Sequence, residues 1–176
     1  SGKQPELWNP LDGTRHEAVS FRQSEGRTTV PLEFDPYGSV FVVFRSPIAP
    51  ETAGCAERNY PRYREVQQIE GPWTVSFDPT WGGPASVVFE TLTDWTQRPE
   101  EGIRYYSGTA VYRKTFDMPA ALFESGPALV LDLGEVHEIA EVRLNGIPLG
   151  ILWTSPFRAA ISRALRVGPN ELEIDI

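Results

Sequence analysis

The chain has 176 residues, 40% of them apolar and 11% aromatic, which suits one domain or one domain with part of a neighbour. Its formal net charge is −8, and 15 of its 24 acidic residues lie in residues 66–176. Such a surface repels phosphate backbones and anionic lipids, which argues against nucleic acid and membranes as partners. No apolar run approaches the roughly 20 residues of a spanning helix. No signal segment opens the chain, and the single cysteine, Cys55, leaves the compartment open.

Short segments rich in Val, Phe, Tyr and Thr, separated by Gly, Pro and Asp, follow one another along the chain, which predicts β-strands. The expected strands are residues 27–34, 39–45, 73–77, 86–90, 110–116, 128–133, 141–144, 148–152, 157–161 and 171–176. Helical periodicity is weak, and at most one turn is expected at 119–124 and at 162–165. This spacing of strands predicts an all-β sandwich or jelly roll.

The chain divides by composition into three parts. Residues 1–46 offer only two or three strands, so we expect a remnant of a small β-domain, with 27–34 and 39–45 forming a β-hairpin. Residues 47–65 are polar and broken by proline, which predicts a linker. Residues 66–176 are expected to form the jelly roll. They end inside a buried-looking strand, which suggests a truncated C-terminus.

Alternation within the expected strands predicts which side chains point into the core. Asn145-Gly146 between two apolar runs predicts a tight hairpin turn, since both central positions of that turn need positive φ. The residues expected to face inward are Val111, Phe116, Leu129, Leu131, Leu133, Val142, Leu144, Leu149, Ile151, Phe157 and Leu172.

Two sets of motifs carry a resemblance to known families. The run "VRLNGIPLG", a Phe-containing strand and "LRVGPNELEI" resemble the galactose-binding-like jelly-roll domain of β-galactosidase- and β-glucuronidase-type glycoside hydrolases, and "YYSGTAVYRKTFDMP" is similar to the strand before it. The ordered series "ELWNPLDG", "GRTTVPLEFDPYGSVFVVFR", "GPWTVSFDPTWGGP", "YSGTAVYRKTF" and "LGILWTSPFR" resembles the C-terminal region of α-L-rhamnosidase-type glycoside hydrolases. This second likeness covers most of the chain.

The resemblance implies a non-catalytic accessory domain that packs beside the catalytic domain of a longer parent enzyme. It also implies that earlier strands precede residue 1, that the jelly roll continues past Ile176, and that the catalytic acids belong to a barrel outside this chain. The implied ligand is a plant or bacterial polysaccharide, with rhamnose among its sugars. For the parent, a periplasmic or secreted location is favoured over a cytoplasmic one. Two alternatives stay open: a free-standing carbohydrate-binding module, and a structural or adhesive module without ligand.

No residue pattern in the chain predicts catalysis. Glycoside hydrolysis uses two facing carboxylates, whereas Glu135 with Glu138 and Glu100 with Glu101 fit solvated loops. The histidines, His16 and His137, lie far apart and form no metal-ligand cluster of the usual spacing. We therefore expect no catalytic residue in this chain.

Aromatic residues in polar loops are the best candidates for sugar contacts, because sugar C–H faces lie on Trp and Tyr rings while polar neighbours bind the hydroxyls. Each ring has an alternative role in the core or at a domain interface: the core is favoured for Trp73, and a core or interface role is favoured for Trp95 and Trp153. The candidates are Trp81, Trp95, Arg104, Tyr105, Tyr106, Trp153 and Arg158. A structural calcium ion is a further hypothesis, with Asp78, Glu90 and Asp94 as ligands together with backbone carbonyls.

Overall fold

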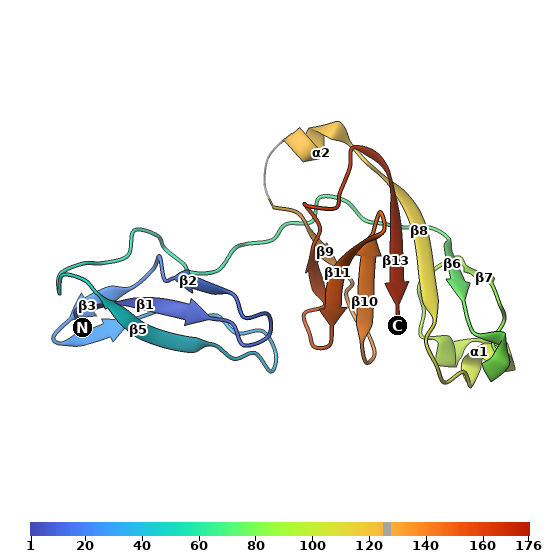
Figure 1. Ribbon diagram of the computed structural model, residues 1–176, viewed down its shortest axis with the longest axis horizontal. Coiled ribbons are helices and arrows are strands. Elements are labelled where there is room, and N and C mark those ends of the chain that lie inside the picture. The colour runs from blue at the N-terminus through green and yellow to red at the C-terminus, as the bar shows by residue number, and fades with distance from the viewer. Residues whose placement is uncertain (125–127) are drawn as a thin grey trace. The chain divides into compact units, whose positions relative to one another are not determined.

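The computed structural model describes residues 1–124 and 128–176, and most of its regular secondary structure is antiparallel strand (Figure 1). The chain forms two compact units, Ser1–Arg64 and Glu65–Ile176. The prediction of an all-β fold is confirmed.

The first unit contains a three-stranded antiparallel sheet in the order β2-β1-β5. Strand β1 is Lys3–Trp8, β2 is Arg15–Glu17 and β5 is Phe41–Pro47, while β3 (Arg22–Ser24) and β4 (Arg27–Thr29) form a separate two-stranded ribbon. Leu7, Ala18 and Phe21 are its buried centre, and partly buried residues such as Val42 pack around them.

Strand pairing in this unit differs from the predicted hairpin of residues 27–34 and 39–45. Strand β4 ends at Thr29 and pairs with β3, whereas β5 pairs with β1. Residues 47–64 also differ from the expected linker, because they belong to the first unit. Asn59 is buried there and holds Ser20, accepting from its backbone N–H at 2.7 Å and donating to its carbonyl at 2.9 Å.

The second unit is a β-sandwich. A six-stranded sheet runs in the order β11-β10-β13-β8-β6-β7, and a two-stranded sheet pairs β12 with β9. Buried residues of the larger sheet pack with Leu129, Leu131 and Ile161 from the smaller sheet and its flanks in one core. The elements are β6 (Trp73–Ser76), β7 (Val87–Phe89), β8 (Val111–Met118), β9 (Val130–Asp132), β10 (Ala140–Leu144), β11 (Ile147–Leu152), β12 (Arg158–Ala160), β13 (Gly168–Asp175), α1 (Glu101–Arg104), α2 (Ala120–Glu124) and the short 3-10 turns η1 (Pro79–Trp81) and η2 (Trp95–Gln97).

The Asn145-Gly146 turn joins β10 to β11, with φ of 53° and 76° at the two residues. Asn145 also connects the hairpin to the first half of β13 and to the loop before it. The Asn145 side chain donates to the Asn170 side-chain oxygen and to the Ala164 carbonyl, each at 2.8 Å, and accepts from the Glu171 backbone N–H at 3.0 Å. Asn170 is fully buried and donates to the carbonyls of Arg166 and Gly168. The turn is therefore part of a satisfied buried polar network.

Two residues expected in the core point elsewhere. Val111 is only partly buried, because β8 turns its even-numbered side chains, such as Tyr112 and Phe116, inward. Ile151 is 61% exposed. The pairing of β10 with β11 shifts between Val142 and Arg143, so one extra residue of β11 reverses the alternation beyond it. The other residues predicted to face inward are buried or partly buried: Phe116, Leu129, Leu131, Leu133, Val142, Leu144, Leu149, Phe157 and Leu172.

Candidate functional site

Three short helical segments, η1, η2 and α1, follow strands β6 and β7 and lie close together at one end of the sandwich (Figure 1). Asp78 caps η1: its Oδ1 accepts from the Thr80 backbone N–H at 2.8 Å and from the Thr80 hydroxyl at 2.6 Å. Asp94 caps η2 in the same way through Thr96, at 2.9 and 2.8 Å. These hydrogen bonds lower the pKa of both aspartates, so both carboxylates are ionised caps of their own turns.

The predicted calcium ligands do not gather into one site. Among the residues that the structure describes, no group of three or more His, Cys, Asp or Glu side chains could hold a metal ion. Asp78 and Asp94 each serve a separate turn, and Glu90 is an exposed residue after β7. The carboxylates therefore give the calcium hypothesis no support.

Two of the aromatic candidates belong to the core beneath these segments. The ring of Tyr106 is buried against Phe77, with centroids 4.9 Å apart, and Trp95 packs on the same Phe77 ring at 5.8 Å. The Tyr106 hydroxyl accepts from the Asp78 backbone N–H at 3.1 Å and donates to the Thr109 carbonyl at 3.2 Å. Because both its ring and its hydroxyl are used by the fold, Tyr106 is scaffold and offers no surface to a sugar.

The other candidates at this end are exposed. Trp81, at the end of η1, is 71% exposed, and Tyr105, directly after α1, is 72% exposed. The guanidinium carbon of Arg104 lies 5.5 Å from the centroid of the Tyr105 ring, which fits a cation–π contact at an exposed site. These three side chains remain available to a ligand.

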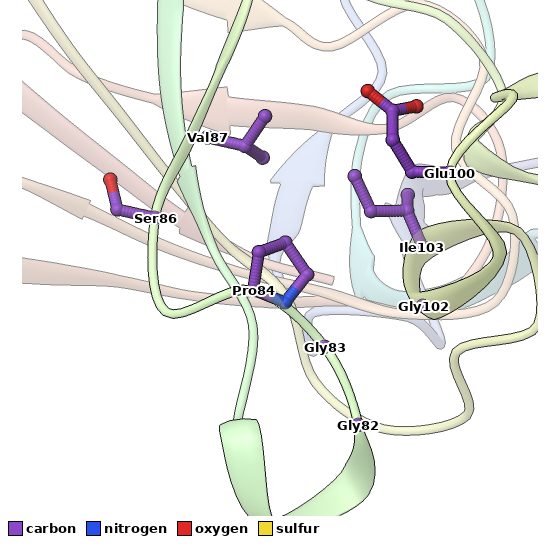
Figure 2. A pocket seen from close by; sticks show the side chains of 8 residues that line it. All are labelled: Gly82, Gly83, Pro84, Ser86, Val87, Glu100, Gly102 and Ile103. Atoms are coloured by element: carbon purple, nitrogen blue, oxygen red, sulfur yellow. The ribbon is translucent and has the colours of Figure 1, made fainter.

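A hollow of about 380 Å³ lies between the β6–β7 connection and α1. Figure 2 shows Pro84, Val87 and Ile103 on its apolar wall, with Ser86 and Glu100 on opposite sides. Its other lining residues are Gly82, Gly83 and Gly102.

The glycines of the hollow permit close packing of its two loops. A Cβ on Gly83 would lie 2.5 Å from Phe77 Cβ, and one on Gly102 would lie 2.5 Å from the Gly82 carbonyl oxygen. Glu100 is held by Arg98, with 2.6 Å between Nη2 and Oε1, and its own backbone N–H and Arg98 lower the pKa of its carboxyl. The arrangement offers a carboxylate and a hydroxyl beside an apolar wall, which suits hydrogen bonding and C–H contact to a small polar ligand.

Trp153 and Arg158 belong to another part of the unit. Trp153 follows β11, which is the edge strand opposite β7, and its side chain is 58% exposed. Arg158 on β12 donates from Nε to Asp132 Oδ2 on β9 at 2.8 Å, so it ties the smaller sheet together. The predicted sugar contacts therefore lie in two separate places: the end that carries η1, η2 and α1, and the region of β11 and β12.

The face of the large sheet that carries Arg113 and Arg143 is an ion-pair network. Arg113 and Arg143 lie on either side of Glu173 in register, at 2.7 and 3.1 Å from its carboxylate oxygens. Arg143 also donates to Asp175 at 2.9 Å and to Glu141 at 2.6 Å, and its hydrogen bonds to Asp175 and Glu173 raise the pKa of its guanidinium. These charges are partly exposed, so each pair contributes modestly to stability.

Besides the ion-pair network of the large sheet, the first unit contains a cluster of Glu6, Trp8, Arg15 and Arg45 that was not predicted from the sequence. Glu6 is 8% exposed and accepts from the Trp8 indole N–H at 2.9 Å and from two nitrogens of Arg45, at 3.1 and 2.8 Å. The guanidinium carbons of Arg15 and Arg45 lie 4.3 and 5.0 Å from the Trp8 ring centroid. The cluster depends on the pairing of Trp8 with Arg15 across β1 and β2, and neither strand was predicted.

No described helix is long and apolar enough to cross a membrane. The histidines remain outside both clusters: His137 lies 3.9 Å from Glu135 in an exposed loop, and His16 lies on the exposed strand β2. Among the described residues that line the hollow, Glu100 is the single carboxylate, so the hollow lacks a facing acid pair.

Comparison with known proteins places this chain beside glycoside hydrolases. No family model matches the sequence. The structure is similar along its whole length to part of a rhamnosidase from Novosphingobium sp. PP1Y, with a TM-score of 0.84 and 37% identity. A Formosa agariphila protein provisionally assigned as a β-glucuronidase is 43% identical over 108 residues, which are 61% of this chain. A β-glucuronidase from Ruminococcus gnavus shares the fold of 66% of the chain at 23% identity, with a TM-score of 0.54.

The chain is much shorter than these relatives. It spans 16% of the rhamnosidase, 9% of the Formosa protein and 23% of the Ruminococcus enzyme. The similarity therefore concerns one domain-sized region of glycoside hydrolases rather than a complete enzyme.

Proposed function

We propose that this chain is an accessory region of a glycoside hydrolase whose parent resembles α-L-rhamnosidases, and that its second unit is a galactose-binding-like jelly roll. The observation that carries this proposal is the similarity of the whole chain to a small part of a rhamnosidase. In this role the chain packs beside the catalytic domain of the parent and carries no catalytic residue of its own.

The chemistry of the described carboxylates supports a non-catalytic role. Asp78 and Asp94 cap short turns, Glu100 stands without a facing acid in the hollow, and Glu173 is shared between two arginines. General acid and base roles in glycoside hydrolysis need two carboxyl groups roughly 5–9.5 Å apart across a sugar. Glu173 lies close to Asp175, but both accept from Arg143 Nη1, so a guanidinium lies between these two carboxylates. The contacts of the other three residues place none of them in such a pair.

Activity assays test the proposal directly. The purified chain should release no nitrophenol from 4-nitrophenyl α-L-rhamnopyranoside or 4-nitrophenyl β-D-glucuronide, whereas the product of the complete gene should hydrolyse one of them. Turnover by the chain that disappears when one Asp or Glu is replaced would overturn the non-catalytic assignment. A complete gene product without glycosidase activity would overturn the assignment of the parent.

Sugar contact is a second, narrower proposal, and the exposed rings of Trp81 and Tyr105 favour it. Titration of the chain with L-rhamnose, D-galactose and D-glucuronic acid, followed by NMR of the indole N–H signals, should shift Trp81 and leave Trp153 unmoved. Because Trp81→Ala removes that signal, its effect is read by calorimetry: Trp81→Ala should abolish sugar binding, and the matched control Trp153→Ala should leave it unchanged. Tight binding of a polysaccharide by the chain alone favours a free-standing binding module, and silence towards every sugar favours a structural module without ligand.

A further inference from the structure

The hollow between the β6–β7 connection and α1 is lined by a single stretch of the second unit, residues 82–103. Its volume of about 380 Å³ falls in the range of roughly 300–1,000 Å³ that is typical of small-molecule sites. Pro84, Val87 and Ile103 form its apolar wall, with Ser86 and Glu100 on opposite sides (Figure 2). Among the residues that line the hollow, Glu100 is the one that carries a charge. The charge that a ligand meets in the hollow is therefore negative.

Arg98 holds the Glu100 carboxylate in place. Its Nη2 donates to Glu100 Oε1 at 2.6 Å, and its Nε donates to Oε2 at 3.1 Å. The guanidinium carbon of Arg98 also lies 4.7 Å from the centroid of the buried Phe89 ring. Because Arg98 is engaged by both the carboxylate and the ring, an anionic ligand would have to break this ion pair to reach it.

Glu100 keeps the capacity to bind a ligand that donates hydrogen bonds. Its side chain is 45% exposed, and a carboxylate has about four acceptor positions, of which Arg98 uses one on each oxygen. The Glu100 backbone N–H and Arg98 lower the pKa of this carboxyl, so it is ionised at neutral pH and can only accept. A ligand that binds to Glu100 must therefore bring hydroxyl or other donor groups.

We propose that Glu100 makes the hollow selective for a neutral sugar and excludes uronic acids. This inference rests on the sugar contact proposed above and adds the class of sugar. A neutral pyranose lays C–H groups on the apolar wall and donates a hydroxyl hydrogen bond to Glu100. A uronic acid of the same shape brings a second carboxylate, ionised at neutral pH, which is repelled by that of Glu100.

Arg104 is the cation at this end that would select the opposite class of sugar. It is exposed and lies outside the lining of the hollow, with its guanidinium carbon 5.5 Å from the centroid of the Tyr105 ring. A uronic acid bound here would pair with the Arg104 guanidinium and lie on the exposed ring. The two arrangements give opposite preferences, so the preference between neutral and acidic sugars shows which group directs binding.

Sugars that differ only at C6 measure this preference. The purified chain is titrated at pH 7 with D-galactose and D-galacturonic acid, and with D-glucose and D-glucuronic acid, while NMR follows the backbone amide signals of Gly82, Gly83 and Gly102. The neutral member of a pair should shift these signals with a dissociation constant at least about tenfold lower than that of the acid. Glu100→Gln keeps the shape of the side chain and removes its charge, so it should reduce this difference to less than about threefold.

Glu101→Gln is the matched control, because Glu101 is the neighbouring exposed carboxylate on α1 and does not line the hollow. It should keep the preference of the unchanged chain, and circular dichroism should show both variants folded. Equal or tighter binding of the uronic acids by the unchanged chain overturns the inference. So does a preference that survives in Glu100→Gln or is lost in Glu101→Gln, or a set of glycine signals that no sugar of the four shifts. Each of these results leaves the contact of a sugar with Trp81 to be decided by its own indole signal and by Trp81→Ala, so the two proposals fail separately.

Discussion

Replacing Leu144 by alanine should be among the most costly single changes in the second unit. Leu144 is fully buried on β10 and pairs with Leu172 on β13 and Ile147 on β11. The substitution removes about three carbon atoms, worth about 0.8 kcal/mol each on burial, or about 2.4 kcal/mol in all. The cavity left between three strands adds to this loss, because sheet backbones collapse little. We therefore expect a loss of about 3–5 kcal/mol in the free energy of unfolding.

Urea-induced unfolding followed by tryptophan fluorescence measures this loss, because four of the five tryptophans lie in residues 65–176. With a urea dependence of about 1–3 kcal/mol per molar, the midpoint should fall by about 1–5 M. Leu92→Ala is the matched control: Leu92 is 56% exposed, and the same substitution there should cost less than about 0.5 kcal/mol. A loss below half a kcal/mol at Leu144, or equal losses at both positions, would refute the assignment of β10 to the core.

Three other changes test the polar interior and the titrating groups. Asn145→Asp keeps the turn but sets a carboxylate against the Asn170 side-chain oxygen, so thermal unfolding should show a loss of about 2 kcal/mol or more. Hydrogen bonds from Arg45 and Trp8 hold the pKa of Glu6 below its ordinary value. The stability that this shift gives the first unit should be present above about pH 4.3 and should fall as the pH drops below that value. Acid unfolding followed by NMR should show this fall in the unchanged chain and not in Glu6→Gln. Burial raises the pKa of Tyr112 to about 12, so its contribution should be lost as the pH rises from about 10 towards 12, and Tyr112→Phe should remove the last phenolate step in an ultraviolet titration.

The sequence predicted the strands of the second unit well, because local signals and tertiary pairing agree there. Alternating apolar residues flank the Asn145-Gly146 turn, and the turn fixes the pairing of β10 with β11. The exception is Ile151, whose exposure depends on the irregular pairing near Gly150, where φ is 115°. A bulge of this kind depends on the neighbouring strand, and alternation along one strand does not reveal it.

Pairing in the first unit could not be predicted in the same way. Three consecutive residues of β1 are buried, and two of them are Pro5 and the charged Glu6. Local propensity assigns such a pattern to a loop. Glu6 is tolerated there because Arg45, 39 residues further along the chain, satisfies its carboxylate. A strand stabilised by such a distant partner leaves no local signal, so residues 27–45 were assigned to a hairpin instead.

The candidate site was predicted only in part, since residue type does not tell which polar groups form hydrogen bonds within the fold. Asp78 and Tyr106 were candidate ligand-binding residues in the sequence, yet the Asp78 carboxylate caps η1 through Thr80 and the Tyr106 hydroxyl accepts from the Asp78 backbone N–H. The hollow depends on Gly83 and Gly102, whose role becomes visible only when the two loops are packed together. Trp81, by contrast, lies where its polar loop predicts, on the surface.

A ligand of the second unit must be bound by side chains that are not already engaged in packing or hydrogen bonding within that unit. The side chains of Asn145 and Asn170 form hydrogen bonds around the β10–β11 turn, and the arginines of the large sheet form ion pairs with carboxylates of the same sheet. At the η1–α1 end, the exposed side chains of Trp81, Arg104 and Tyr105 remain, together with the Ser86 hydroxyl and the single carboxylate of Glu100. Rings and a hydroxyl can orient a sugar through C–H contact and hydrogen bonding, but they supply no acid and base pair. This set of groups is consistent with the accessory, non-catalytic role proposed above.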